Sequence, residues 1–169
     1  MSLDWSHLYR STFPDLVRFL HRKVWDLERA RDLAQEVFVR ALGEEPERPR
    51  AFLFTVAANL ARDEARTVLR RKQHLALLKG EAEGRMASDD PERDLEDAER
   101  LDRARRALEQ LAERDREILL LWDAGLDYRE LAEQTGLAIG AIGTTLARAR
   151  KRLVVAFETL DGDTHVARH

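Results

Sequence analysis

Hydrophobic residues along this chain recur at the three- and four-residue spacing of amphipathic α-helices, and no segment shows the sustained two-residue alternation of a β-strand. The pattern predicts a first helical segment over residues 4–25, in which Pro14 is a place for a break or bend. A second helix is expected over residues 28–42, and a third begins near Arg50. The third helix has a core stripe at Leu53, Val56, Ala57 and Leu60. The sequence therefore predicts an all-α fold.

The stretch DYRELAEQTGLAIGAIGTTLARARKRL, residues 127–153, predicts a helix, a turn and a second, basic helix. The first of these helices would turn Tyr128, Leu131 and Ala132 inward. Gly136 would form the turn, because glycine enters the left-handed conformation without a steric clash. The second helix would bury Ile142, Leu146, Ala149 and Leu153. This is the pattern of a DNA-binding helix-turn-helix, and the alternative is a helical hairpin in an ordinary all-α protein.

Residues 76–100 differ in composition from the helical segments on either side. They contain two glycines, a Ser-Asp-Asp-Pro turn and a dense acidic run, with little to bury. Such a segment predicts a flexible acidic linker, most clearly over residues 79–93. We therefore expect two small helical domains, at 1–75 and 101–160, the second containing the helix-turn-helix. Residues 161–169 then form a frayed tail.

Two further helices precede the helix-turn-helix and are expected to brace it. The first has an apolar stripe at Leu101, Ala104, Leu108 and Leu111. The second begins near residues 113–115 and stops at Gly125, and its inner side consists of Ile118, Leu119 and Trp122.

Composition limits the possible functions. The 169 residues carry a formal net charge of -3, so any nucleic-acid surface must come from local basic patches. The absence of cysteine excludes disulfides, thiolate zinc sites and cysteine nucleophiles. The five histidines lack metal-ligand spacing, so we expect no cofactor, no metal and no catalytic site. No apolar run could span a bilayer and no secretory signal is present, which predicts a cytoplasmic protein without membrane insertion.

The second helix carries an unusual surface opposite its apolar stripe. This surface consists of Asp32, Gln35, Glu36 and Val39. A valine among acidic and amide side chains is either a scattered surface residue or part of a face that docks a partner, and the pattern favours neither.

The third helix projects a stripe of polar residues within a narrow sector. Its members are Asn59, Asp63, Arg66 and Arg70, with Phe52 in line and Arg71 extending the positive end. Arginine binds phosphates or base edges, Asn and Asp read bases, and an aromatic ring stacks on an exposed base, so the stripe suits single-stranded or opened DNA. The alternative is a solvated face in which Asp63 and Arg66 form an ion pair.

Taken together, these segments resemble a bacterial sigma factor of the small, two-domain extracytoplasmic-function (ECF) type, over about residues 8–157. ARDLAQEVFVRAL is similar to the segment that binds the clamp helices of core RNA polymerase, which implies that role for Asp32, Gln35, Glu36 and Val39. AFLFTVAANLARDEARTVLRRK resembles the segment that melts and reads the minus-ten promoter element, which implicates Phe52, Asn59, Asp63, Arg66, Arg70 and Arg71. ALEQLAERDREILLLWDAGLDYRELAEQTGL resembles the start of the domain for the minus-thirty-five element, and the DNA contacts expected from its helix-turn-helix are Arg129, Thr144, Thr145, Arg148, Lys151 and Arg152.

The resemblance implies a promoter-specificity subunit without covalent chemistry, whose partners are core RNA polymerase, promoter DNA and an anti-sigma factor or another inhibitor. The chain departs from the family on the face that reads DNA. Family members usually have a Ser near Ala138, a Thr at Ala141, a Lys at Gly143 and an Arg at Thr145. The lost cap hydroxyl and the lost basic groups predict a changed DNA affinity or a changed promoter element.

Two other classes of protein stay open. One is an ordinary helix-turn-helix repressor or activator, which needs neither the surface around Asp32 nor the polymerase. The other is a decoy that imitates a sigma factor in order to capture an anti-sigma factor, and the altered second helix of the helix-turn-helix favours it.

Overall fold

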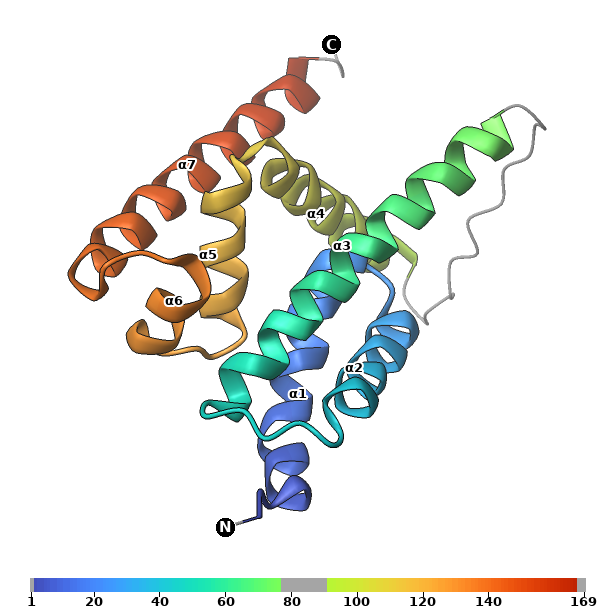
Figure 1. Ribbon diagram of the computed structural model, residues 1–169. Helices are drawn as coiled ribbons and strands as arrows, with labels where there is room; N and C mark the ends of the chain where they lie inside the picture. The colour runs from blue at the N-terminus through green and yellow to red at the C-terminus, as the bar shows by residue number, and fades with distance from the viewer. Residues whose placement is uncertain (1, 77–90, 167–169) are drawn as a thin grey trace. The chain divides into compact units, whose positions relative to one another are not determined.

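The computed structural model describes residues 2–76 and 91–166, and every regular element in these ranges is an α-helix (Figure 1). In chain order the helices are α1 (Trp5–Val24), α2 (Leu27–Ala41), α3 (Pro49–Ala76), α4 (Pro91–Gln110), α5 (Glu113–Asp123), α6 (Tyr128–Thr135) and α7 (Ile139–Val166). The predicted all-α fold is confirmed. None of the helices in the described ranges is long and apolar enough to cross a membrane.

The helices belong to two compact units that are not continuous in sequence. The first combines Met1–Gly80 with Leu120–Ile139, and the second combines Glu81–Leu119 with Gly140–His169. The unit boundary therefore falls within α5 and again near the start of α7. The sequence pattern predicted one continuous segment for each domain, because periodicity records local packing and not contacts between distant segments.

Helices α1, α2 and α3 pack against one another around the core of the first unit (Figure 1). The rings of Phe19 from α1 and Phe54 from α3 meet edge to face, with centroids 5.7 Å apart, and both side chains are fully buried. Phe54 was absent from the predicted stripe of α3, whereas Val56 is only partly buried. Three helices, α1, α2 and α6, contact α3, so its buried sector is wider than the single stripe that the pattern identified.

The first helix runs through Pro14 without a break. Thr12 and Leu16 are buried on either side of the proline, so packing holds both halves of the helix in line. The helix ends at Trp25, which has a left-handed φ of 57° and donates its backbone N–H to the carbonyl oxygen of His21. Asp26 then caps α2 by accepting the backbone N–H of Arg29 at 3.0 Å.

Within the first unit, α6 contacts the start of α3 through polar side chains. The guanidinium group of Arg50 lies 3.1 Å from a carboxylate oxygen of Asp15 and 2.9 Å from one of Glu130. The amide nitrogen of Gln134 donates to the carbonyl oxygen of Ala51 at 2.6 Å. The contacts of α3 with Glu130 and Gln134 join segments about eighty residues apart, which explains why the apolar pattern did not predict them.

Helix α4 begins at Pro91, so the predicted linker, which extended to residue 100, was too long. Proline suits the first turn of a helix because its missing N–H is not needed there, and Glu92 and Asp94 favour the positive end of the helix dipole. The acidic run over residues 91–100 is thus the start of a helix. Residues 77–90, which hold most of the predicted linker, lie outside the described residues.

Helix α7 continues to Val166, so the prediction of a frayed tail from residue 161 was wrong for residues 161–166. Arg103 of α4 pairs with Asp161 at 2.6 Å, and its guanidinium group lies 5.4 Å from the ring centre of Phe157. These two contacts hold the end of α7 within the second unit, and residues 167–169 lie outside the described part of the chain.

Three predicted core residues lie near the surface instead. Tyr128 is 44% exposed and Trp122 is 39% exposed, and their rings contact each other with centroids 5.6 Å apart. Leu101 is also exposed, while Ala107 of the same helix is fully buried. The two aromatic rings partly cover one another instead of entering the core, while Leu120 and Leu121 of α5 are buried although the pattern did not assign them to its inner side.

Candidate polymerase and nucleic-acid interfaces

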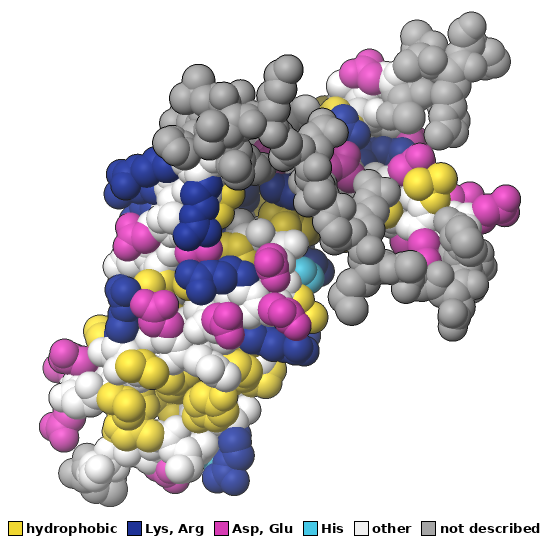
Figure 2. All heavy atoms as spheres, turned by 90° about the vertical axis from the view of Figure 1, so that its right-hand side faces the viewer, with side chains coloured by type: hydrophobic (Ala, Val, Ile, Leu, Met, Phe, Trp, Pro, Cys, Tyr) yellow, Lys and Arg dark blue, Asp and Glu magenta, His cyan; other side chains and the backbone are white. Residues whose placement is uncertain are grey.

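The face of α2 opposite the core is a mixed acidic and apolar surface. Asp32 and Gln35 are exposed, and Val39 is 66% exposed, as the sequence pattern predicted. Glu36 accepts a hydrogen bond from Arg40 at 2.6 Å, one helical turn further along. Seen from the side on which α2 lies, acidic and basic side chains alternate beside a group of hydrophobic side chains (Figure 2). We call Asp32, Gln35, Glu36 and Val39 the α2 face.

An apolar cluster adjoins this part of α2, and sequence reasoning missed it. The ring of Tyr9 stacks on Phe13 with centroids 4.7 Å apart and meets Phe38 of α2 at 4.8 Å. Leu42, directly after α2, is 60% exposed. The four-residue spacing of the two aromatic residues in α1 was a usable signal.

The predicted stripe on α3 lies on its surface. Asn59, Asp63, Arg66, Arg70 and Arg71 are exposed, and Phe52 is partly buried. No ion pair joins Asp63 to Arg66 in the part of the chain that the structure describes, so the expected alternative pairing is absent. The amide oxygen of Asn59 accepts a long hydrogen bond of 3.4 Å from Arg62. The stripe is therefore accessible to a ligand, and we call these six residues the α3 stripe.

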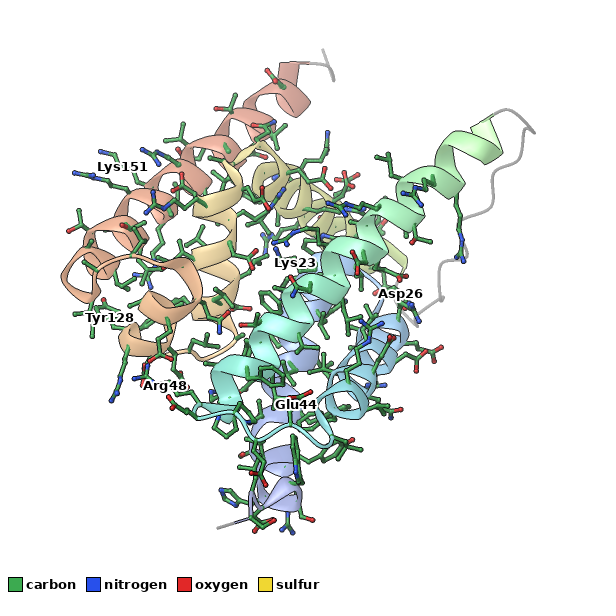
Figure 3. All side chains as sticks on the ribbon, in the orientation of Figure 1. Lys23, Asp26, Glu44, Arg48, Tyr128 and Lys151 are labelled. Carbon is green, nitrogen blue, oxygen red and sulfur yellow. The ribbon has the colours of Figure 1, made fainter. Side chains whose placement is uncertain are left out.

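A two-bond ion pair connects α2 with α3. Nε and Nη2 of Arg29 each donate to one carboxylate oxygen of Glu64, both at 2.8 Å. Figure 3 places Asp26, whose carboxylate caps the same turn of α2, at the amino end of that helix. The hydrogen bonds from Arg29 lower the pKa of Glu64, and those to Glu64 raise the pKa of Arg29. Local sequence patterns do not predict this pair, because its members are separated by 35 residues.

Helix α6 and the turn after it have strong local signals. Asp127 and Glu130 form a reciprocal capping box at the start of α6, and Gly136 ends the helix with a left-handed φ of 71°. The predicted glycine turn is confirmed. Arg129 is exposed, with its Nε 3.7 Å from Glu133. Ala138 directly precedes α7 and has no hydroxyl with which to cap it.

The basic residues of α7 differ in their surroundings. Thr144, Arg148 and Lys151 are exposed, and Lys151 points away from the helix into solvent (Figure 3). Arg152 instead donates to Asp115 of α5 at 2.6 Å, and Asp115 is only 6% exposed.

The hydroxyl of Thr145 is also engaged, because it donates to the carbonyl oxygen of Ala141 at 2.7 Å. Three of the predicted DNA contacts of the helix-turn-helix, Arg129, Thr145 and Arg152, thus already have partners within the chain, whereas Thr144, Arg148 and Lys151 are exposed surface groups. Within the described residues, no group of three or more His, Asp or Glu side chains could hold a metal ion.

Comparison with known proteins identifies both halves of the chain. The family described as Sigma-70 region 2 matches residues 8–74, and the one described as Sigma-70, region 4 matches residues 101–153. The chain belongs to the sigma-70 family. It is 30% identical over 152 residues to "RNA polymerase sigma factor YlaC" of Bacillus subtilis (strain 168), covering 86% of this chain and 87% of that one. It is 32% identical over 154 residues to "Ferric citrate uptake sigma factor FecI" of Escherichia coli (strain K12), covering 88% and 87%.

Solved sigma factors share the fold. The sigma factor RpoE of Bartonella quintana, in complex with the anti-sigma factor NepR, has a TM-score of 0.61 and 25% identity, over 92% of this chain and 97% of that one. CnrH, in complex with the cytosolic domain of CnrY, has a TM-score of 0.62 and 24% identity, over 94% and 88%. This sigma factor is thus of the ECF type, with region 2 and region 4.

Membership in the family defines the function of the chain. It is a promoter-specificity subunit that binds core RNA polymerase and directs transcription initiation. Sigma factors are non-enzymatic initiation factors. An ordinary helix-turn-helix regulator is excluded, because region 2 accounts for the N-terminal helices that such a regulator would not need.

Proposed function

We propose that the α2 face is the surface of this sigma factor that docks on core RNA polymerase. The observation that supports it most directly is Val39, a large apolar side chain exposed beside the exposed Asp32 and Gln35. Burial of Val39 by a partner would be favourable, while the neighbouring carboxylates would select a basic surface on that partner. The chain performs no covalent chemistry and acts in the cytoplasm, where the polymerase is.

The α3 stripe contacts the minus-ten element in its opened, single-stranded form. Arg66 and Arg70 are exposed along one side of the helix and can reach phosphates, which supplies affinity without sequence preference. Asn59 has a side-chain amide that can pair with a base edge, and its single long hydrogen bond to Arg62 is easily exchanged. Phe52 is partly buried, so only part of its ring is available for stacking.

The helix-turn-helix contacts the minus-thirty-five element mainly through its exposed groups. Arg148 and Lys151 on α7, together with Arg129 on α6, supply phosphate contacts. Thr144 is exposed, and the hydroxyl of Thr145 is hydrogen-bonded to the carbonyl oxygen of Ala141. Threonine is uncharged, so neither residue replaces the charge of a basic side chain. We expect weak duplex binding by this region.

An anti-sigma factor controls whether the sigma factor is available to the polymerase. The solved complexes of RpoE with NepR and of CnrH with CnrY support this control.

The experiment for the polymerase contact is a pull-down of core RNA polymerase with the purified chain and with Glu36→Arg. The substitution reverses a charge on the α2 face, so we expect at least a tenfold loss of polymerase binding. Helix content and melting temperature should change little, because Glu36 lies at the surface of α2 and loses only its ion pair with Arg40, which is worth under about 0.5 kcal/mol.

Asp102→Arg, an exposed charge reversal on α4, is the matched control and should bind polymerase like the unmodified chain. Retention of polymerase by Glu36→Arg would show that the docking surface lies elsewhere on the chain. A large fall in melting temperature would show that Glu36 contributes to the core.

A further inference from the structure

The α2 face and the α3 stripe lie on different helices, so their relative placement depends on how α2 packs against α3. Ala30 of α2 and Ala57 and Ala61 of α3 are all buried, so small side chains are part of the core around these helices. The hydrophobic effect that drives this packing has no preferred direction. The apolar core holds the two helices together, and a directional contact between them adds a further constraint on their rotation and register.

The Arg29–Glu64 pair is directional where the apolar core is not. Both hydrogen bonds measure 2.8 Å and join the planar guanidinium group to the planar carboxylate. Such a paired fork fixes both distance and orientation. The side chain of Glu64 is 15% exposed and that of Arg29 is 41% exposed, so water competes only partly for the pair.

The pair also lies between the two proposed surfaces. Arg29 precedes Asp32 by three residues and Glu36 by seven, which places all three on one side of α2. The carboxylates of Asp32 and Glu36 contribute to the raised pKa of Arg29. On α3, Glu64 directly follows Asp63 of the stripe, and Arg71 contributes to the lowered pKa of Glu64. Each member of the pair is thus electrostatically coupled to one of the two surfaces.

We propose that Arg29 and Glu64 are positioning residues that hold the α3 stripe in register with the α2 face, so that a sigma factor docked on polymerase presents the stripe to the opened strand. This inference rests on the proposed roles of the two surfaces. A docked sigma factor cannot rotate to compensate for a displaced stripe, whereas the free chain can. The pair therefore matters for strand opening in the holoenzyme and not for strand binding by the free chain.

Two variants test the proposal. Arg29→Lys keeps the charge but loses the second hydrogen bond and the planar fork. The double variant Arg29→Gln with Glu64→Gln removes both charges together, so that no unpaired charge is left to bind Asp32 or Arg71. The matched control is Arg106→Gln with Asp102→Asn, which removes an exposed ion pair of 3.0 Å within α4.

Three quantities are measured for each variant: affinity for core polymerase, affinity of the free chain for a single-stranded minus-ten oligonucleotide, and the fraction of promoter opened by holoenzyme at saturating polymerase. The promoter and its minus-ten strand are taken from a genomic fragment that the unmodified holoenzyme transcribes. We expect both test variants to open at least fivefold less promoter while the two affinities stay within about twofold, because the docked sigma factor then presents a displaced α3 stripe to the strand. The control should match the unmodified chain in all three.

Any other pattern overturns the proposal. If opening is unchanged, the pair has no functional role. The melting temperature of each variant is measured as well, and if it falls together with all three quantities, the pair is only structural. Different results would contradict the proposed function itself. Normal polymerase binding by Glu36→Arg would contradict the role of the α2 face, and normal oligonucleotide binding by Arg66→Ala would contradict the role of the α3 stripe.

Discussion

Arg152 and Lys151 are adjacent basic residues of α7 with different physical roles. Arg152 is hydrogen-bonded to the nearly buried Asp115, whereas Lys151 is exposed and points into solvent. In the sequence the two residues look equivalent, because both are basic and both lie outside the apolar stripe of the same helix. Only the position of Asp115 in the fold separates a positioning arginine from a lysine that is free to contact DNA.

Arg152→Ala should destabilise the protein by about 1 to 3 kcal/mol, because it leaves the Asp115 carboxylate without its partner in a nearly buried place. Lys151→Ala should change stability by under about 0.5 kcal/mol. In duplex binding the order reverses: Lys151→Ala should reduce the slope of log affinity against log salt by about 0.9 if it removes one phosphate contact. Urea unfolding and DNA titrations at several salt concentrations measure both. Equal stability losses for the two variants would contradict the assignment.

At the scale of single elements, α7 keeps the apolar residues that bury one side of the helix but lacks two of the basic residues expected on the side that faces DNA. Ile142, Leu146 and Ala149 are buried as predicted, whereas Gly143 and Thr145 occupy places where basic residues were expected. Glycine in a helix costs roughly 1 kcal/mol relative to alanine. The pattern of this helix thus supports folding more than it supports phosphate binding.

Gly143→Lys with Thr145→Arg should strengthen duplex binding and steepen its salt slope by about 0.9 for each phosphate reached. Removal of the helical glycine should also stabilise α7, by under about 1 kcal/mol, although the hydroxyl bond from Thr145 to Ala141 is lost. The reference variant Gly140→Ala changes a nearby glycine that has no neighbouring atom within 4 Å of the added carbon. It should stabilise α7 without altering the salt slope. A steep slope in the unmodified protein would mean that other residues of α7 already reach the phosphates.

At the scale of the whole molecule, the sequence predicted what depends on local periodicity and composition. The all-α class, the capped turn at Gly136 and the exposure of Asp32 and Val39 follow from residue spacing and backbone preference. The ion pairs Arg29–Glu64 and Arg50–Glu130 do not, because they join distant segments whose approach is set by the fold. The acidic start of α4 was misjudged for a related reason, since composition alone does not distinguish a helix start from a linker.

The last prediction separates a working sigma factor from a decoy that only captures an anti-sigma factor. Purified chain and core polymerase are incubated with genomic DNA, and the transcripts are sequenced. A working sigma factor should yield a small set of new start sites, because promoter choice comes from the strand and duplex contacts of one subunit. Arg66→Ala with Arg70→Ala should still assemble with polymerase yet reduce these transcripts at least tenfold, because the phosphate contacts that hold the opened strand are lost.

Arg105→Ala with Arg106→Ala removes the same number of positive charges from α4 and should leave the transcripts at their unmodified level. This control separates the placement of the arginines on α3 from a general loss of positive charge. A decoy would give no new start sites with any of the three proteins, even though the chain folds. The weak duplex binding of α7 would then reflect a DNA-binding site that the decoy no longer uses. New start sites that depend on Arg66 and Arg70 would instead show that contacts with the opened strand compensate for weak duplex binding.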